Sequence, residues 1–237
     1  MNDYSYLEQE ESMGLSRSFS VLMRNVYTWM ALGLLMTALT SLIVVRDENL
    51  LYTIATRPPL MWGLLIAELA MVLILSVRIM KMSFPVAGLM FAAYAILNGL
   101  TMAFIFAVYT AESIATTFFI TAGTFAGMSV LGYTIKRDLS QVGRILYMLL
   151  IGLIIAMIVN IFMKSSGLGM ILNYLGVIIF VGLTGYDTQK IKNMLMMYSE
   201  AGVTDETNKL ALLGSLSLYL DFVNLFLYLL RFFGNRR

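Results

Sequence analysis

The sequence predicts an all-α integral membrane protein with seven transmembrane helices. Hydrophobic residues make up 59% of the 237 residues and charged residues only 13%, whereas soluble domains carry about 25% charged residues. The mean hydropathy is +0.82. Seven apolar runs approach or exceed the roughly 20 residues that cross a bilayer as a helix. We therefore expect one compact helical bundle in a membrane.

The seven predicted spans follow one another with short connections. They cover residues 26–45, 60–80, 85–109, 113–133, 145–163, 168–188 and 211–233. Charges, prolines or small polar residues separate them, at Arg46 to Glu48, Arg57 to Pro59, Lys81 to Pro85, Glu112, Lys136 to Asp138, Lys164 to Gly167, and Ser199 to Lys209. The predicted organisation is a short polar cytoplasmic N-terminus over 1–25, one transmembrane domain over 26–233, and a tail over 234–237.

The distribution of basic residues predicts the orientation, because cytoplasmic loops carry an excess of Lys and Arg. With a cytoplasmic N-terminus the inner side holds Arg17, Arg24, Arg78, Lys81, Lys136, Arg137, Arg144, Lys190, Lys192 and Lys209. The outer loops then hold only Arg46, Arg57 and Lys164. The C-terminal Arg231, Arg236 and Arg237 lie outside in this orientation, against the rule. An even number of spans or a re-entrant helix would place them inside.

The composition excludes several classes of chemistry. The chain has no cysteine and no histidine, so disulfides, thiolate catalysis and Ser-His nucleophilic machinery are impossible. A net charge of +2 is too small to indicate a nucleic-acid partner, and no motif predicts a cofactor. In the fourth span, Gly123 and Gly127 have the small-xxx-small spacing that predicts close packing against another helix.

Two aspartates in apolar spans are the most informative residues. Asp187 lies in the sixth span and Asp221 in the seventh. A charge in hydrocarbon is unfavourable by several kcal/mol or more, so intramembrane carboxylates are rare and usually functional. Two carboxylates that come close raise each other's proton affinity and titrate as a unit. With histidine absent, this pair is the predicted pH sensor and gate.

On the seventh span, Asp221 heads a polar stripe. At about 100° per residue, Ser217, Asn224, Tyr228 and Arg231 share an arc of about 80° with it. Hydrogen bonding that holds helices together is the alternative explanation of such a stripe. We predict that Asn224 and Arg231 line or support an ion path.

Asp187 has a structural alternative as well. It sits close to the predicted end of its span, where Lys190, three residues on, would share its helix face and pair with it. Only a sixth helix that continues past Lys192, or a water-filled crevice, would bring Asp187 to Asp221.

Two further charges lie in the second span. Arg78 at its inner end is at the depth of Asp187, and such a pair would act as a latch that protonation loosens. A snorkelling arginine at a helix end is the alternative. Glu68 lies at mid-span, where a charge has no ordinary structural explanation, and we predict that it supports the ion path with Arg231 as its partner.

The sequence resembles the transmembrane Bax inhibitor motif family. The resemblance rests on Gly185-Tyr-Asp187-Thr-Gln-Lys190-Ile-Lys192 and on the longer run from Ser217 through Asp221 and Asn224 to Gly234. It implies six helices around a central seventh and a Ca²⁺ leak under pH control. It also implies that Asp187 and Asp221 are the family's paired aspartates, Glu68 its second-helix glutamate and Arg231 the arginine that ends the seventh helix. The family's latching arginine would be Arg78, displaced by one residue. Bacterial members imply an inner-membrane location, and some resemble modulators of membrane proteases.

We therefore predict a pH-sensitive Ca²⁺ leak channel, with Asp187 and Asp221 as weak Ca²⁺ ligands. Ca²⁺ prefers about 6–8 oxygens, so two aspartates suit passage better than storage. An alternative is a membrane-embedded regulator that binds and restrains a membrane protease or another partner. A third hypothesis is an intramembrane aspartyl protease, since Tyr186-Asp187 matches half of that signature. The other half, Gly-x-Gly-Asp, is absent before Asp221, so we predict no enzymatic activity.

Overall fold

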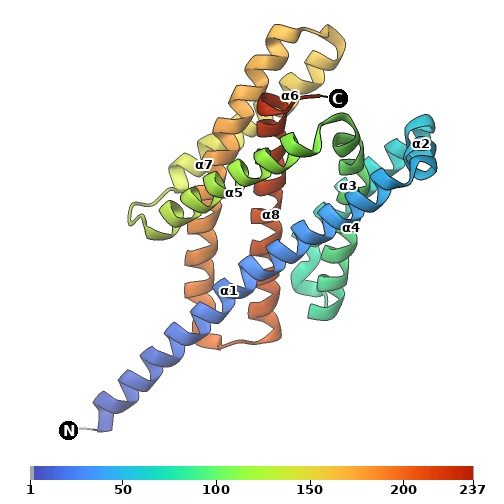
Figure 1. Ribbon diagram of the computed structural model, residues 1–237. Coiled ribbons are helices and arrows are strands. Elements are labelled where there is room, and N and C mark those ends of the chain that lie inside the picture. Colours follow the sequence, from blue (N-terminus) through green and yellow to red (C-terminus); the bar gives the residue numbers. More distant parts are fainter. Residues whose placement is uncertain (1–2, 237) are drawn as a thin grey trace. The chain divides into compact units, whose positions relative to one another are not determined.

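The computed structural model describes residues 3–236 and is helical along almost all of that range (Figure 1). The helices in chain order are α1 (Asp3–Arg46), α2 (Glu48–Thr56), α3 (Pro58–Arg78), α4 (Phe84–Val108), α5 (Ala111–Thr134), α6 (Ser140–Met163), α7 (Ser166–Tyr198) and α8 (Asp205–Phe233). Two short 3-10 helices, Ile79–Lys81 and Ser199–Ala201, follow α3 and α7.

The prediction of seven spans is confirmed. Seven helices in the described part of the chain are long and apolar enough to cross a membrane: α1 from Met13, α3, α4, α5, α6, α7 and α8. In α8, 72% of an 18-residue stretch is buried, against 6–39% in the other six. The arrangement of six helices around a central seventh remains a prediction.

Two features at the N-terminal end were not part of the sequence prediction. Residues 3–25, expected as a polar N-terminus, continue the helix of the first span. The connection after that span contains α2, which the hydropathy pattern did not predict. The Asp47 side chain accepts a hydrogen bond from the Leu50 N–H at 3.0 Å and caps α2. At nine residues, α2 is too short to cross a bilayer.

The chain forms two compact units, which are described separately. The first comprises the residues up to Ile105 together with Ile191–Ser217, and the second comprises Phe106–Lys190 and the residues from Leu218 onward. Helices α4, α7 and α8 each contribute to both units.

In the first unit, hydroxyl groups join α1 to α4. Thr37 Oγ1 donates to the Ala95 carbonyl at 2.9 Å and Ser41 Oγ donates to the Gly99 carbonyl at 2.8 Å. A Cβ at Gly99 would overlap Thr40, so this glycine permits the close approach of the two helices. Hydrogen bonds between buried hydroxyls and helix carbonyls are a normal means of joining membrane helices.

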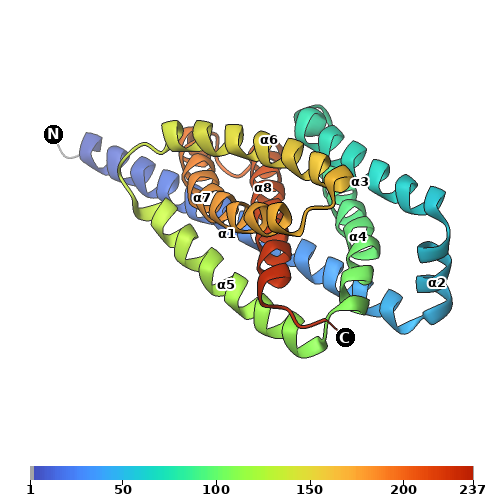
Figure 2. The ribbon, with the colours of Figure 1, turned by 90° about the horizontal axis from the view of Figure 1, so that it is seen from above.

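In the second unit, α7 packs closely against α5, α6 and α8, which lie on different sides of it (Figure 2). A Cβ at Gly132 of α5 would overlap the carbonyl of Gly185 in α7. Likewise, Gly143 of α6 lies against the Tyr186 ring. Close helix contact through such glycines is common in membranes. The predicted contact through Gly123 and Gly127 is wrong, because both glycines are exposed and a Cβ at either meets nothing within 4 Å.

We predict that alanine substitutions at Gly132 and Gly123 change the stability of the protein differently. Gly132→Ala should destabilise the second unit by about 1–3 kcal/mol, the usual range for overpacking, because the new methyl group would overlap the Gly185 carbonyl. Gly123→Ala is the matched control on the same helix and should leave stability unchanged or slightly raised. Thermal unfolding of the purified protein in detergent measures both. Equal melting temperatures for the two variants would contradict the close approach of α5 and α7.

Candidate functional site: a buried carboxylate pair

The two predicted aspartates both lie in the second unit. Asp187 on α7 is 4% exposed and Asp221 on α8 is 5% exposed. Helix α7 continues to Tyr198, past Lys192, so Asp187 lies within the helix and not at its end. A sixth span that continues past Lys192 is one of the two arrangements expected to bring Asp187 to Asp221. We call Asp187 and Asp221 the carboxylate pair.

Asp187 accepts hydrogen bonds from a tyrosine of α6. The Tyr147 hydroxyl lies 3.1 Å from Oδ1 and 3.4 Å from Oδ2 of Asp187. The Tyr147 ring packs edge-on against Tyr186, with ring centroids 6.0 Å apart. Since Gly143 leaves room for the Tyr186 ring, this packing fixes the hydroxyl that reaches Asp187. Lys190 lies within electrostatic range of Asp187; the ion pair expected from their spacing on α7 remains a prediction.

Asp221 is less well satisfied. Its Oδ2 is buried and has no hydrogen-bond partner among the described residues. It lies within electrostatic range of Asp187 and Lys190, and the Tyr147 hydroxyl interacts electrostatically with both aspartates. A buried carboxylate oxygen without a partner is unfavourable by about 1–3 kcal/mol, and by more when it is charged. The site is therefore suited to a proton or a cation at this oxygen.

Polar side chains of α7 next to the pair are used structurally. The Thr188 hydroxyl donates to the Thr184 carbonyl at 2.7 Å and to Ser129 Oγ at 3.4 Å. Gln189 donates from Nε2 to the carbonyls of Ile135 and Arg137 and accepts from the Leu139 N–H. Gln189 thereby joins the connection between α5 and α6 to α7, two residues beyond Asp187.

Sequence reasoning did not identify Tyr147 or Gln189. Tyr147 is a single tyrosine near the start of an apolar run, a position where tyrosine commonly marks the membrane interface. The sequence around Tyr147 does not distinguish it from a tyrosine at the membrane interface. Its contact with Asp187 arises from the packing of α6 on α7, which the sequence of α6 alone does not encode.

The predicted charges of the second span lie in the first unit. Glu68 is half-buried on α3 and accepts a hydrogen bond from Thr101 Oγ1 of α4 at 2.7 Å. Arg78 is the last residue of α3 and is exposed. Its role as a latch for the carboxylate pair remains a prediction.

The polar residues of the stripe on α8 differ in their surroundings. Asn224 is half-buried and donates from Nδ2 to the Leu220 carbonyl of its own helix at 2.8 Å. Arg231 is exposed, and its guanidinium lies 5.6 Å from the centre of the Tyr228 ring. Tyr228 is buried and stacks on Phe180 of α7, with ring centroids 5.7 Å apart. The proposed pairing of Glu68 with Arg231 remains a prediction; the contacts that the structure shows are with Thr101 and Tyr228.

The site offers few ligands for a metal ion. Within residues 3–236, no group of three or more His, Cys, Asp or Glu side chains is placed to hold a metal ion. Two carboxylates with the Tyr147 hydroxyl provide fewer than the 6–8 oxygens that Ca²⁺ prefers. Two buried carboxyl groups can each bind and release a proton, and weak binding of Ca²⁺ by them remains a prediction.

Comparison with known proteins gives consistent results. The family model described as "Inhibitor of apoptosis-promoting Bax1" matches residues 20–237. The chain is 49% identical over 215 residues to "Inner membrane protein YbhL" of Escherichia coli strain K12, which covers 91% of this chain and 92% of the relative. Uncharacterized proteins of Deinococcus radiodurans and Borreliella burgdorferi are 40% and 43% identical, over 98% and 90% of this chain and 96% and 90% of the relatives.

Proposed function

The chain belongs to the family described as inhibitor of apoptosis-promoting Bax1, and we propose that it forms a pH-sensitive leak pathway for Ca²⁺ across the bacterial inner membrane. The observation that carries the proposal is the buried Asp221 Oδ2, which has no hydrogen-bond partner in the described part of the chain and lies within electrostatic range of Asp187. A site with an unsatisfied anionic oxygen inside a membrane span suits a permeating cation or a proton.

The proposed control works through protonation of the carboxylate pair. An ionised carboxylate only accepts hydrogen bonds, whereas a protonated one also donates. With one proton on the pair, one carboxyl group can donate to the other and hold α7 and α8 together. With none, two like charges repel unless a cation lies between them. Ca²⁺ compensates that repulsion only transiently, because the pair provides few of its ligands.

Purified protein in lipid vesicles that contain a Ca²⁺-sensitive dye tests the proposal. We expect Ca²⁺ entry above that of protein-free vesicles and a rate that changes between about pH 5 and pH 8. The rate rises with pH if repulsion within the deprotonated pair opens the path. It falls with pH if deprotonated Asp187 forms the predicted latch with Arg78 and closes the path. A dye signal equal to that of empty vesicles at every pH contradicts the proposal. The alternative of a regulator that restrains a membrane protease, which needs no ion path, would then be favoured.

We further propose that the carboxylate pair is not proteolytic. Asp221 lies in the middle of the continuous helix α8 and follows Leu218-Tyr219-Leu220, so helical bonding occupies the neighbouring backbone groups that a substrate strand would need. Asp187→Asn and Asp221→Asn should leave every cleavage pattern in a reconstituted panel of membrane substrates unchanged. Loss of one specific product in both variants would show that the protein is an enzyme.

A further inference from the structure

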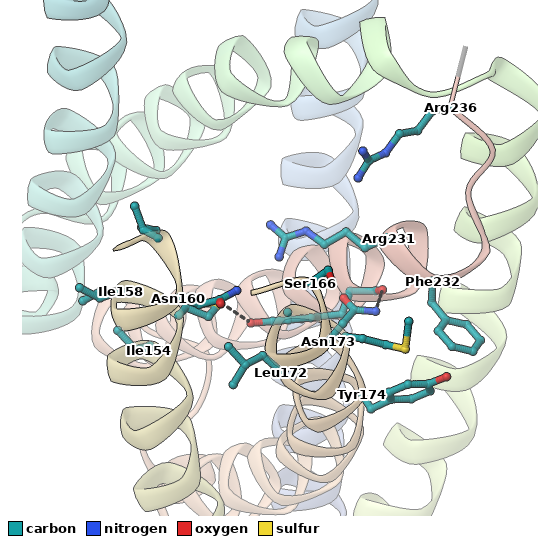
Figure 3. Close-up of a pocket in the computed structure, with 15 residues that line it drawn as sticks. Ile154, Ile158, Asn160, Ser166, Leu172, Asn173, Tyr174, Arg231, Phe232 and Arg236 are labelled. Atoms are coloured by element: carbon teal, nitrogen blue, oxygen red, sulfur yellow. Dashed lines mark hydrogen bonds between the residues drawn. The ribbon is translucent and has the colours of Figure 1, made fainter. Parts of the chain in front are cut away.

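A second site lies in the second unit, among α6, α7, α8 and the C-terminal tail. There the structure contains an open pocket of about 850 Å³, within the range of about 300–1,000 Å³ usual for small-molecule sites. Its lining includes Arg231 and Arg236, together with Asn160, Asn173 and Ser166 (Figure 3). We call it the arginine pocket. It is lined by none of the residues of the carboxylate pair.

The charge of the arginine pocket is unbalanced. Arg231 and Arg236 both lie above Asn160 and Asn173 in the view of Figure 3, and none of the fifteen lining residues is acidic. Two guanidinium groups that face one space repel each other unless an anion lies between them. Arginine binds phosphate with two parallel hydrogen bonds and is the preferred side chain for that group. The lining therefore has the charge of a site for a phosphate-bearing ligand.

The polar side chains of the pocket are held in place by the fold. Asn173 donates from Nδ2 to the Tyr228 carbonyl at 3.2 Å, while its buried Oδ1 has no hydrogen-bond partner in the described residues. Asn160 Oδ1 accepts from the Ser165 N–H at 3.1 Å. Arg236 is positioned by the tail, where the Thr110 N–H donates to the Asn235 carbonyl at 3.1 Å and Asn235 N–H donates to Ser113 Oγ at 2.9 Å. Asn173 Oδ1 can accept from a ligand hydroxyl.

The remaining walls are apolar and partly exposed. Ile158 of α6 is 53% exposed and Met170 of α7 is 63% exposed, and both line the pocket. A soluble phosphate compound would gain nothing from these side chains, whereas an acyl chain would cover them. The pocket lies near one end of three candidate spans, since α6 ends at Met163, α7 begins at Ser166 and α8 ends at Phe233. The ends of membrane spans are where lipid headgroups are expected. The occupant that fits is an amphiphile with an anionic head.

We propose that the arginine pocket binds an anionic phospholipid, with its phosphate at Arg231 and Arg236 and an acyl chain along α6 and α7. In the orientation predicted from the loops, this is the outer leaflet. The bound phosphate accounts for the basic C-terminal residues that lie on that side against the positive-inside rule. Basic pockets between membrane helices are a general means of binding anionic lipid heads.

Native mass spectrometry of the full-length protein in detergent, titrated with phosphatidylglycerol, tests this inference. We expect one lipid to bind more tightly than the rest and Arg231→Gln/Arg236→Gln to weaken that binding about tenfold or more, since two charge-assisted hydrogen-bonding groups are lost. The matched control, Arg137→Gln/Arg144→Gln, removes the same charge from exposed positions next to the connection of α5 and α6 and should bind as wild type does. Arg236→Gln alone, in the tail beyond α8, should give a partial loss even if the double variant folds poorly.

Two further arms identify the ligand. Phosphatidylcholine should not replace the tight lipid, and inorganic phosphate should not displace it. Equal binding of phosphatidylglycerol by wild type and by the Arg231/Arg236 variant would overturn the inference, as would equal binding of phosphatidylcholine or full displacement by phosphate. Asp221→Asn should bind the lipid as wild type does, so failure of the Ca²⁺ proposal and failure of the lipid site are distinguishable.

Discussion

Replacing Asp221 by Asn should remove the pH dependence of Ca²⁺ entry into vesicles. Asparagine keeps the size and the acceptor oxygen of the side chain but cannot ionise. An interaction of about 1.4 kcal/mol between the two carboxylates corresponds to a factor of ten in their protonation equilibrium. We therefore expect the pH-dependent part of the rate to fall about tenfold or more when this interaction is lost. Dye-loaded vesicles across pH 5 to 8, the range in which a coupled carboxylate would act, measure this directly.

Asp138→Asn is the matched control for that experiment. Asp138 is exposed in the connection between α5 and α6, and Ser140 donates to its Oδ1 from the hydroxyl at 2.7 Å and from the backbone N–H at 2.9 Å. These hydrogen bonds hold the pKa of the Asp138 carboxyl below its ordinary value, so it stays ionised throughout the assay. Its substitution should leave both rate and pH dependence unchanged. Equal effects of the two substitutions would mean that surface charge, and not the buried carboxylate, controls the flux.

Tyr147→Phe should move the pH midpoint of the flux upward by about one unit. The variant keeps the ring packing on Tyr186 but removes the hydroxyl that donates to Asp187 at 3.1 Å. A hydrogen bond to a charged group contributes about 1.5–3 kcal/mol, and 1.4 kcal/mol corresponds to one pH unit. Without that donor the charged form loses stabilisation, and the protonated form persists to higher pH.

The same vesicle assay measures the Tyr147 effect. Tyr198→Phe removes a hydroxyl from an exposed tyrosine and should leave the midpoint in place. A Tyr147→Phe midpoint that equals wild type would show that the contact between Tyr147 and Asp187 does not contribute to the pH response.

The seven spans could be predicted because a bilayer imposes length and apolarity on every helix that crosses it. Helix α2 was not predicted, because a helix of nine residues that is capped by Asp47 does not contain the long apolar run by which a span is recognised. The packing of Gly123 was predicted wrongly for a different reason. Small-residue spacing shows that a helix can approach another closely but not which face meets a neighbour, and Gly132, outside that motif, makes the approach to Gly185.

For the candidate site, the sequence drew attention to two aspartates but did not predict their contacts. Asp187 and Asp221 stood out because charge is rare in apolar spans, and both are buried. The polar stripe of α8 was a weaker guide, because Asn224 bonds to its own helix in a way that angular position cannot reveal. Tyr147 could not be identified, because its role depends on a neighbouring helix and not on its own segment.

We expect Asp187 and Asp221 to titrate as one coupled pair. Infrared spectroscopy of the reconstituted protein follows the carboxylic-acid C=O band of Asp221 across pH, assigned by its loss in Asp221→Asn. In Asp187→Asn the neighbouring charge is gone, so the titration of Asp221 should move to lower pH than in wild type. A titration of Asp221 that is identical in wild type and in Asp187→Asn would show that the two carboxylates act independently and do not form a coupled pair.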